Sequence, residues 1–253
     1  MRIARRYMPA CLLLVLTAIA CEPSRAAQGA AEQMVIVPLG GFTMGADLDP
    51  AGDESPSHVV DLPTFWVGTF EVTNGHYRRC VEAGACTEPQ DLRFFADERV
   101  DNLPAVYVTW YQAEAYCGWL KKRLPSEAEW EKAARGAEAL AYPWGNDPSL
   151  ENLNAGLRFD GPVRVGIFPQ GAGPYGALDM AGNVWEWTAD WYQPYAGSAF
   201  HSDLFGEKYK VVRGGSWNHP VEDARTFHRD IAHPARALLV VGFRCVADRP
   251  LTP

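Results

Sequence analysis

Arg123-Leu-Pro-Ser-Glu-Ala-Glu-Trp-Glu131 is the most informative run of residues in this chain. Ser126 is followed three residues later by Glu129, which is the spacing of a capping box at the start of a helix. Because glycine is common just past the end of a helix, Gly136 predicts where this helix ends. Thr109 is expected to cap a second, amphipathic helix upstream, from Trp110 to Leu120.

Short strands are predicted on both sides of these helices. They are residues 34–44 (two strands broken at Pro38 and Gly40), 58–62, 104–108, 184–191, 210–214 and 240–247. A short helix is expected at 77–82, and the polar, acidic residues 46–57 are expected to form a loop. Residues 137–180 are rich in Gly, Pro and Asn, so irregular backbone there must be held by side chains, disulfides or ions. No internal repeat is visible, and one domain is predicted.

The N-terminus has the pattern of a signal peptide. Three arginines precede the short apolar run 10–20, which predicts a signal peptide over residues 1–20. Ala18-Ile-Ala-Cys21 resembles a bacterial lipobox in which Cys21 is acylated, and Ser24-Arg-Ala-Ala27 is the alternative cleavage site. We expect a flexible tether over 21–33 and a folded domain over 34–250. The protein is then exported, either to the periplasm or as an outer-membrane-anchored lipoprotein of a bacterium.

The charge limits the classes of partner. The chain has a formal net charge of -8, and removing residues 1–20, which hold three Arg and no acid, makes it -11. An acidic domain argues against nucleic acid or an anionic membrane surface as partner. We expect contact with a membrane only through a lipid on Cys21.

Apart from Cys21, four cysteines remain after the leader, at positions 80, 86, 117 and 245. An even number in an oxidising compartment favours two disulfides, and the spacing suggests Cys80 with Cys86 and Cys117 with Cys245. A zinc site is the alternative, but no C-x2-C pair is present.

Eight phrases, in order, resemble one protein family. They are Gly40-Gly-Phe-Thr-Met-Gly45, Phe70-Glu-Val-Thr-Asn74, Val108-Thr-Trp110 with Tyr116-Cys117, Lys122-Arg-Leu-Pro-Ser-Glu-Ala-Glu-Trp-Glu131, Tyr142-Pro-Trp-Gly145, Asp179-Met-Ala-Gly-Asn-Val-Trp-Glu-Trp187, Arg213-Gly-Gly-Ser-Trp217 and Gly242-Phe-Arg-Cys245. The family is that of the sulfatase-modifying factors, or formylglycine-generating enzyme-like proteins. The resemblance implies a mixed α/β domain with a distorted C-type-lectin-like topology, a disulfide matching Cys117 to Cys245, and bound calcium.

Two calcium sites are implied by the resemblance. The ligands of the first are Asp179, Gly182, Val184 and Glu186. Asp179 and Glu186 flank a glycine-containing turn, and carboxylate and carbonyl oxygens are what calcium takes. The alternative is a pair of solvated acids, which is disfavoured because Glu186 stands between two tryptophans. The second site would use Asn154 and Ala155, with Asp160 as the only substitute for a shortened acidic loop.

The founding activity of the family, oxidation of a sulfatase cysteine to formylglycine, uses copper held by two cysteines. Those positions are His219 and Ala224 here, so the usual copper site is not expected. His219, His228 and His233 lie within fifteen residues and are an alternative set of metal or acid–base groups. The other interpretation is that they are ordinary surface histidines. Relatives that make sulfoxides with iron carry their histidines on a separate helical domain, which has no counterpart here.

A ligand groove is predicted along Ser216, Trp217, Asn218, Arg225 and Arg229. An arginine in a cleft can bind a carboxylate through two hydrogen bonds, or it can serve backbone carbonyls, and the sequence does not separate the two uses.

Two functions are weighed. The favoured one is a calcium-stabilised binding or accessory module for an envelope or periplasmic protein, a peptide or a glycan. The alternative is an oxidoreductase resembling periplasmic family members implicated in siderophore maturation, with His219 and His228 as candidate catalytic residues. Formylglycine generation is a third possible function, and the sequence argues most directly against it.

Overall fold

Helix α3 (Glu127–Arg135) lies at the centre of the computed structural model, which describes residues 33–49 and 51–249. Both halves of the predicted capping box are present: Ser126 Oγ accepts from the Glu129 N–H at 3.1 Å, and the Glu129 carboxylate accepts from the Ser126 N–H at 2.8 Å. Trp130, Ala133 and Ala134 are fully buried against Phe65 and other apolar side chains. The prediction from residues 123–136 is confirmed.

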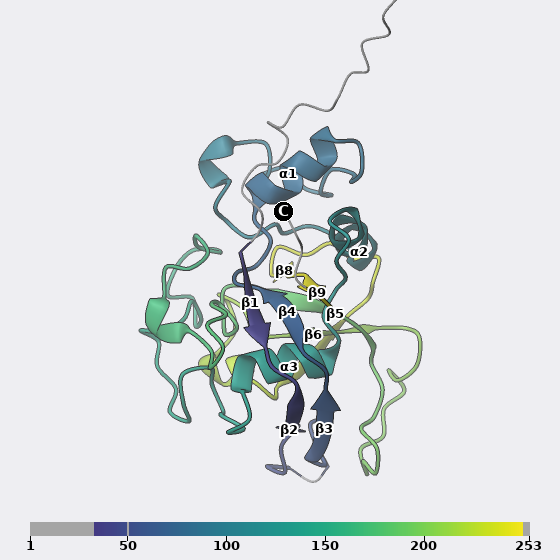
Figure 1. The fold of residues 1–253 in the computed structure, drawn as a ribbon. Helices are drawn as coiled ribbons and strands as arrows, with labels where there is room; N and C mark the ends of the chain where they lie inside the picture. Colours follow the sequence, from purple (N-terminus) through teal and green to yellow (C-terminus); the bar gives the residue numbers. More distant parts are fainter. Residues whose placement is uncertain (1–32, 50, 250–253) are drawn as a thin grey trace, which may run out of the picture. The chain divides into compact units, whose positions relative to one another are not determined.

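Within the described residues, nine strands form three small sheets, shown in Figure 1. The strands are β1 (Met34–Val37), β2 (Gly40–Met44), β3 (His58–Leu62), β4 (Phe65–Gly68), β5 (Trp185–Trp191), β6 (Lys210–Arg213), β7 (Arg229–Ala232), β8 (Val241–Gly242) and β9 (Val246–Ala247). The sheet orders are β1-β4-β9, β2-β3 and β7-β6-β5-β8. All neighbours are antiparallel except β5 and β8.

The remaining helices are short. They are α1 (Asn74–Glu82), α2 (Trp110–Trp119) and the 3-10 turns η2 (Glu98–Val100), η3 (Pro169–Gly171) and η4 (Val221–Ala224). Figure 1 shows α1 and α2 at one end of the domain and the β2–β3 hairpin at the other, with the larger sheets between them. Long irregular segments connect these elements, and together they form one mixed α/β domain, as predicted.

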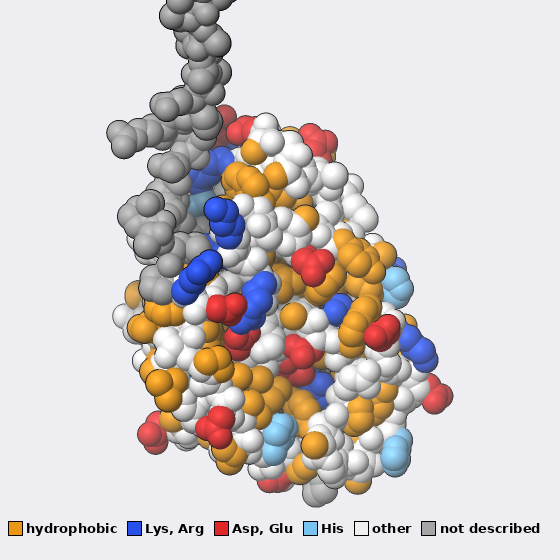
Figure 2. All heavy atoms as spheres, turned by 45° about the vertical axis from the view of Figure 1, so that its right-hand side comes forward, with side chains coloured by type: hydrophobic (Ala, Val, Ile, Leu, Met, Phe, Trp, Pro, Cys, Tyr) orange, Lys and Arg blue, Asp and Glu red, His pale blue; other side chains and the backbone are white. Residues whose placement is uncertain are grey.

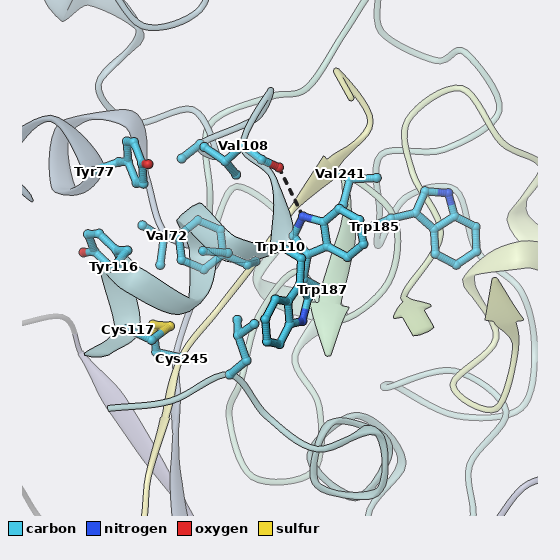
Figure 3. Close-up of a cluster of buried hydrophobic side chains, with 14 of the residues drawn as sticks. Val72, Tyr77, Val108, Trp110, Tyr116, Cys117, Trp185, Trp187, Val241 and Cys245 are labelled. Carbon is cyan, nitrogen blue, oxygen red and sulfur yellow. Dashed lines mark hydrogen bonds between the residues drawn. A yellow bond between two sulfur atoms is a disulfide. The ribbon is translucent and has the colours of Figure 1, made fainter. Parts of the chain in front are cut away.

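The largest core cluster joins α1 and α2 to β5 and β8. Tyr77, Tyr116, Trp187 and Phe243 are buried in it (Figure 3). The Tyr77 and Tyr116 rings stack with their centroids 5.6 Å apart, and the Trp187 indole N–H donates to the Val108 carbonyl at 3.2 Å. Large aromatic side chains thus fill much of the core between short helices, short strands and irregular segments.

Both predicted disulfides are present. Cys80 and Cys86 close the turn after α1, and Cys117 of α2 joins Cys245 beside β9. The second bridge spans 128 positions in the sequence. It therefore ties the middle of the domain to its last strand.

Two strand predictions are wrong. Residues 104–108 are irregular: the Ala105 N–H donates to the Val72 carbonyl and the Tyr107 N–H to the Leu238 carbonyl, so the segment bonds to separate neighbours instead of one ladder. The single strand predicted over 240–247 is two strands, because β8 pairs with β5 whereas β9 crosses to β4. Strand β7 was not expected.

The predicted signal peptide, Cys21 and nearly all of the tether lie outside the described residues. Among residues 33–49 and 51–249, no helix is long and apolar enough to cross a membrane.

Candidate functional site

The segment that follows β6 carries most of the predicted catalytic and groove residues. Gly214 and Gly215 adopt φ angles of 100° and 75°, in the region that favours glycine. A Cβ atom on Gly215 would lie 3.0 Å from the Ala224 Cα atom. This close approach folds the segment back against η4 and leaves Ser216 only 1% exposed.

Trp185, at the start of β5, contacts both predicted catalytic histidines. Its ring centroid lies 5.6 Å from that of His219 and 5.9 Å from that of His228. Trp185 is 2% exposed, and its indole N–H has no acceptor among the described residues. Figure 3 shows its ring at the margin of the core cluster, apart from Trp110 and Trp187. The structure therefore gathers Trp185, His219 and His228 at one place, defined here as the Trp185 site.

Each histidine of the Trp185 site is anchored through Nδ1. His219 Nδ1 lies 2.6 Å from Ser216 Oγ, and Ser216 Oγ donates to Asn218 Oδ1 at 2.8 Å. A serine has one hydroxyl proton, so with the Asn218 amide oriented this way His219 must donate from Nδ1. His228 Nδ1 lies 2.7 Å from Glu54 Oε1. Both rings are thus left with Nε2 as the nitrogen that can accept a proton or meet a ligand.

The two predicted groove arginines have different surroundings. Arg229 is 5% exposed, pairs with Glu127 at 2.7 Å and donates to the carbonyls of Asp53 and Gln193. Its guanidinium therefore binds a buried carboxylate and two backbone carbonyls inside the domain. Arg225 is partly exposed, with its guanidinium 5.3 Å from the centre of the Phe227 ring.

The other predicted residues of this region are spread more widely. Trp217 is partly exposed, although its indole nitrogen is buried without an acceptor among the described residues. Asn218 is exposed. His233 lies beside Tyr209, with ring centroids 6.1 Å apart.

A second cluster surrounds Glu186 on β5. Glu186 is fully buried and accepts two hydrogen bonds from Arg244, each 2.7 Å long. Asp179, with a φ of 56°, accepts from the Gly166 N–H at 2.6 Å. Glu71 accepts from Asn183 through one oxygen, and its other oxygen is buried without a partner among the described residues.

This cluster disfavours the ionised forms of Glu71 and Asp179. Burial raises the pKa of Glu71 well above its ordinary value, and the nearby Asp179 and Glu186 raise it further. Burial likewise raises the pKa of Asp179. Arg244 is the cation that acts on both. If all three groups were ionised beside this one guanidinium, two negative charges would be in excess.

The face of the domain drawn in Figure 2 mixes acidic, basic and hydrophobic side chains, with several histidines at the surface. Basic side chains are interspersed with acidic ones there instead of forming one patch.

A family model described as the sulfatase-modifying factor enzyme 1-like domain matches residues 20–249. The chain belongs to this family. Hercynine oxygenase of Mycolicibacterium smegmatis is 33% identical over 87% of this chain, which spans 62% of that protein. The inactive C-alpha-formylglycine-generating enzyme 2 of Bos taurus is 33% identical, covering 94% of this chain and 96% of that protein.

Among solved structures, PvdO from Pseudomonas aeruginosa superposes with a TM-score of 0.69 and 28% identity, covering 84% of this chain and 93% of PvdO. The predicted formylglycine-generating-enzyme-like fold is confirmed.

The copper-binding positions of the sulfatase-modifying-factor family do not fit copper here. Ala224 is fully buried with Leu153, Ala155 and Ala181. All four cysteines within residues 33–49 and 51–249 are in disulfides. A linear copper(I) centre needs two thiolates, which this part of the chain does not supply. In the same residues, no group of three or more His, Cys, Asp or Glu side chains is placed to hold a metal ion.

The first calcium site fits better because its ligands include backbone carbonyls. Asp179 and Glu186 lie beside the unpartnered Glu71 oxygen, and a divalent cation would balance the two excess charges. The second site has a mixed fit. Asn154 is buried, with its side-chain oxygen unpartnered among the described residues, whereas Asp160 is exposed. Ala155 is buried.

Three site residues, Trp185, Glu71 and Glu54, were missed by the sequence predictions. Trp185 lies in the family phrase that ends at Trp187. Glu71 lies in the family phrase Phe70-Glu-Val-Thr-Asn74, which was a usable signal. Glu54 lies in an acidic loop far from His228 in the sequence, and no local pattern marks it.

Proposed function

We propose that this protein is an exported, copper-independent enzyme of the sulfatase-modifying-factor family. It binds its substrate at the Trp185 site and moves protons through His219 and His228. The observation that carries the proposal is the placement of two Nδ1-anchored imidazoles against one buried indole whose N–H lacks an acceptor. Histidine is the side chain best suited to proton transfer near neutral pH.

We further propose that the reaction is an oxidation of a small molecule or peptide, in which the substrate loses two electrons and two protons and dioxygen accepts them to become hydrogen peroxide. The support comes from relatives: a 33% identical protein is a hercynine oxygenase, and the domain resembles PvdO over nearly all of its length. Because the chain spans less than two thirds of the oxygenase, its substrate is not carried over. The Trp185 indole N–H would donate to an oxygen of the substrate, while the free Nε2 atoms would accept its protons.

Calcium is the cofactor we propose, as a structural ion held by Asp179, Glu186 and the carbonyls of Gly182 and Val184. It would stabilise the turn that leads into β5, on which Trp185 lies. Its chemistry at this site is charge balance.

A binding or accessory module without catalysis, for an envelope protein, peptide or glycan, is the second candidate. The relative from Bos taurus, matched along almost its whole length, is named as inactive. The family fold therefore also occurs in a protein whose name describes it as an inactive formylglycine-generating enzyme.

The test uses the full chain, purified from the envelope fraction of cells that produce it. It is incubated with a small-molecule extract of the same cells, and products that have lost two hydrogens are sought by mass spectrometry. Wild type is compared with His219→Ala, His228→Ala and, as a matched control, His233→Ala. Turnover in wild type and the control, with loss in the other two variants, supports the enzyme. A ligand retained by all four proteins without turnover supports the binding module.

A further inference from the structure

Among residues 33–49 and 51–249, Glu54 is the one carboxylate in direct contact with a histidine of the Trp185 site. Its Oε1 atom lies 2.7 Å from His228 Nδ1, although the two residues are 174 positions apart in the sequence. The other carboxylate near this ring is Asp223, whose Oδ1 atom lies 3.9 Å from His228 Nε2. That separation is too long for a direct hydrogen bond. The two ring nitrogens therefore have different surroundings.

Glu54 lies in the loop between β2 and β3, and hydrogen bonds to this loop hold it in position. Arg229 donates to the Asp53 carbonyl at 2.8 Å, and the Tyr192 hydroxyl donates to the Asp53 carboxylate at 2.7 Å. The Glu54 carbonyl accepts from the Ala46 N–H at 2.9 Å. Backbone and side-chain bonds on both sides thus fix the loop where Glu54 meets His228.

Gly45 allows the loop to close this tightly. Its φ is 79°, and a Cβ atom there would lie 2.5 Å from the Glu54 carbonyl oxygen. Any other residue would push Glu54 away or strain the backbone. Gly45, the last glycine of the phrase Gly40-Gly-Phe-Thr-Met-Gly45, therefore helps to form the Trp185 site, although the other residues of that site lie much later in the sequence.

The contact decides which tautomer His228 adopts. A carboxylate can only accept hydrogen bonds, so Nδ1 must carry the proton and Nε2 keeps its lone pair. Carboxylate–histidine pairs fix ring orientation and tautomer in the same way at many catalytic and metal sites.

We propose that Glu54 is the positioning residue of the site, holding His228 as the Nδ1–H tautomer so that Nε2 is the proton acceptor. Its effect on turnover rests on the function proposed above, whereas the tautomer does not. Glu54 acts through His228 and need not touch the substrate.

The experiment measures the tautomer directly. The full chain is labelled with 15N-histidine, and two-bond 1H–15N correlations are recorded for neutral His228, assigned by comparison with His228→Gln. Wild type is expected to show a protonated Nδ1 and an unprotonated Nε2. Glu54→Ala should shift the pattern toward Nε2–H, and Glu54→Gln should keep it because the amide oxygen still accepts. Asp49→Ala, which removes an exposed carboxylate from the same loop, should leave it unchanged.

An Nε2–H pattern in wild type overturns the proposal, even if Glu54→Ala does not fold. An unchanged pattern in folded Glu54→Ala also overturns it. If Glu54→Ala changes the tautomer and product formation is unaffected, the positioning function stands and the proposed catalytic function of His228 fails.

Discussion

Glu127 shows how a single buried charge organises the irregular part of this domain. Its carboxylate meets Arg213 at 2.8 Å and Arg229 at 2.7 Å, and all three side chains are nearly inaccessible to solvent. Burial alone would raise the pKa of Glu127, but the two guanidinium groups outweigh it and lower the pKa. Arg229, predicted as a groove residue from the sequence, is part of this interior network.

The Glu127→Gln variant is expected to lose on the order of 3 kcal/mol of unfolding free energy, because two arginines remain buried with less compensation. A lowered folded-state pKa means that the stabilisation is complete above the ordinary value of 4.5 and is lost as the pH falls through the lowered value. Urea denaturation between pH 3 and 7 should therefore show a flatter acid limb for Glu127→Gln than for wild type. The exposed Glu138→Gln is the control. Parallel acid limbs for Glu127→Gln and wild type would contradict the assignment.

Helix α3 is the secondary-structure element that the local sequence specifies best. The Ser126–Glu129 capping box provides acceptors for backbone N–H groups that have no partner at the start of the helix. The buried apolar face begins directly after this box, at Trp130.

Ser126→Ala should lower the unfolding free energy by about 1 kcal/mol, the usual cost of removing an N-cap side chain. Thermal or urea unfolding measures the change, with Ser149→Ala as a partly exposed control that caps no helix. Loss of less than a few tenths of a kcal/mol would show that packing of Trp130 alone holds the helix start.

The strands were less predictable than the helices. An apolar run indicates burial but does not say which neighbour its backbone bonds to. Residues 104–108 are buried between Val72 and Leu238 and never form a ladder. Residues 240–247 change sheets after Gly242, which depends on the positions of β4 and β5 and not on the run itself. Cap signals are local, whereas strand pairing is a property of the assembled domain.

For the domain as a whole, the family phrases predicted the fold and the neighbourhood of Ser216, and the number and spacing of the cysteines predicted the two disulfides. They did not predict that His219 and His228 would share Trp185, because that contact joins β5 to the segment that follows β6. Nor did they reveal Glu54, which comes from a third segment. Tertiary packing determines how a site is assembled from distant loops. Only residues that lie in a recognisable family phrase could therefore be predicted from the sequence.

Calcium should control the stability of the whole domain. At a calcium concentration of one hundred times Kd, a bound ion stabilises by about 2.7 kcal/mol, or about 5–10 °C in Tm for a domain of this size. Scanning calorimetry in calcium and in chelator should show this difference for wild type and not for Asp179→Asn. In chelator, Asp179→Asn should be at least as stable as wild type, since it removes one excess charge from beside Glu71. Equal wild-type Tm values in calcium and chelator would rule out the site.

The pairing of β9 with β4, and of Cys245 with Cys117, bears on how the chain is made. Until residues 245–247 have been synthesised, β4 lacks its β9 neighbour and Cys117 lacks its disulfide partner. Contacts between residues so far apart in the sequence form slowly, so this sheet and this bridge are expected to close late in folding.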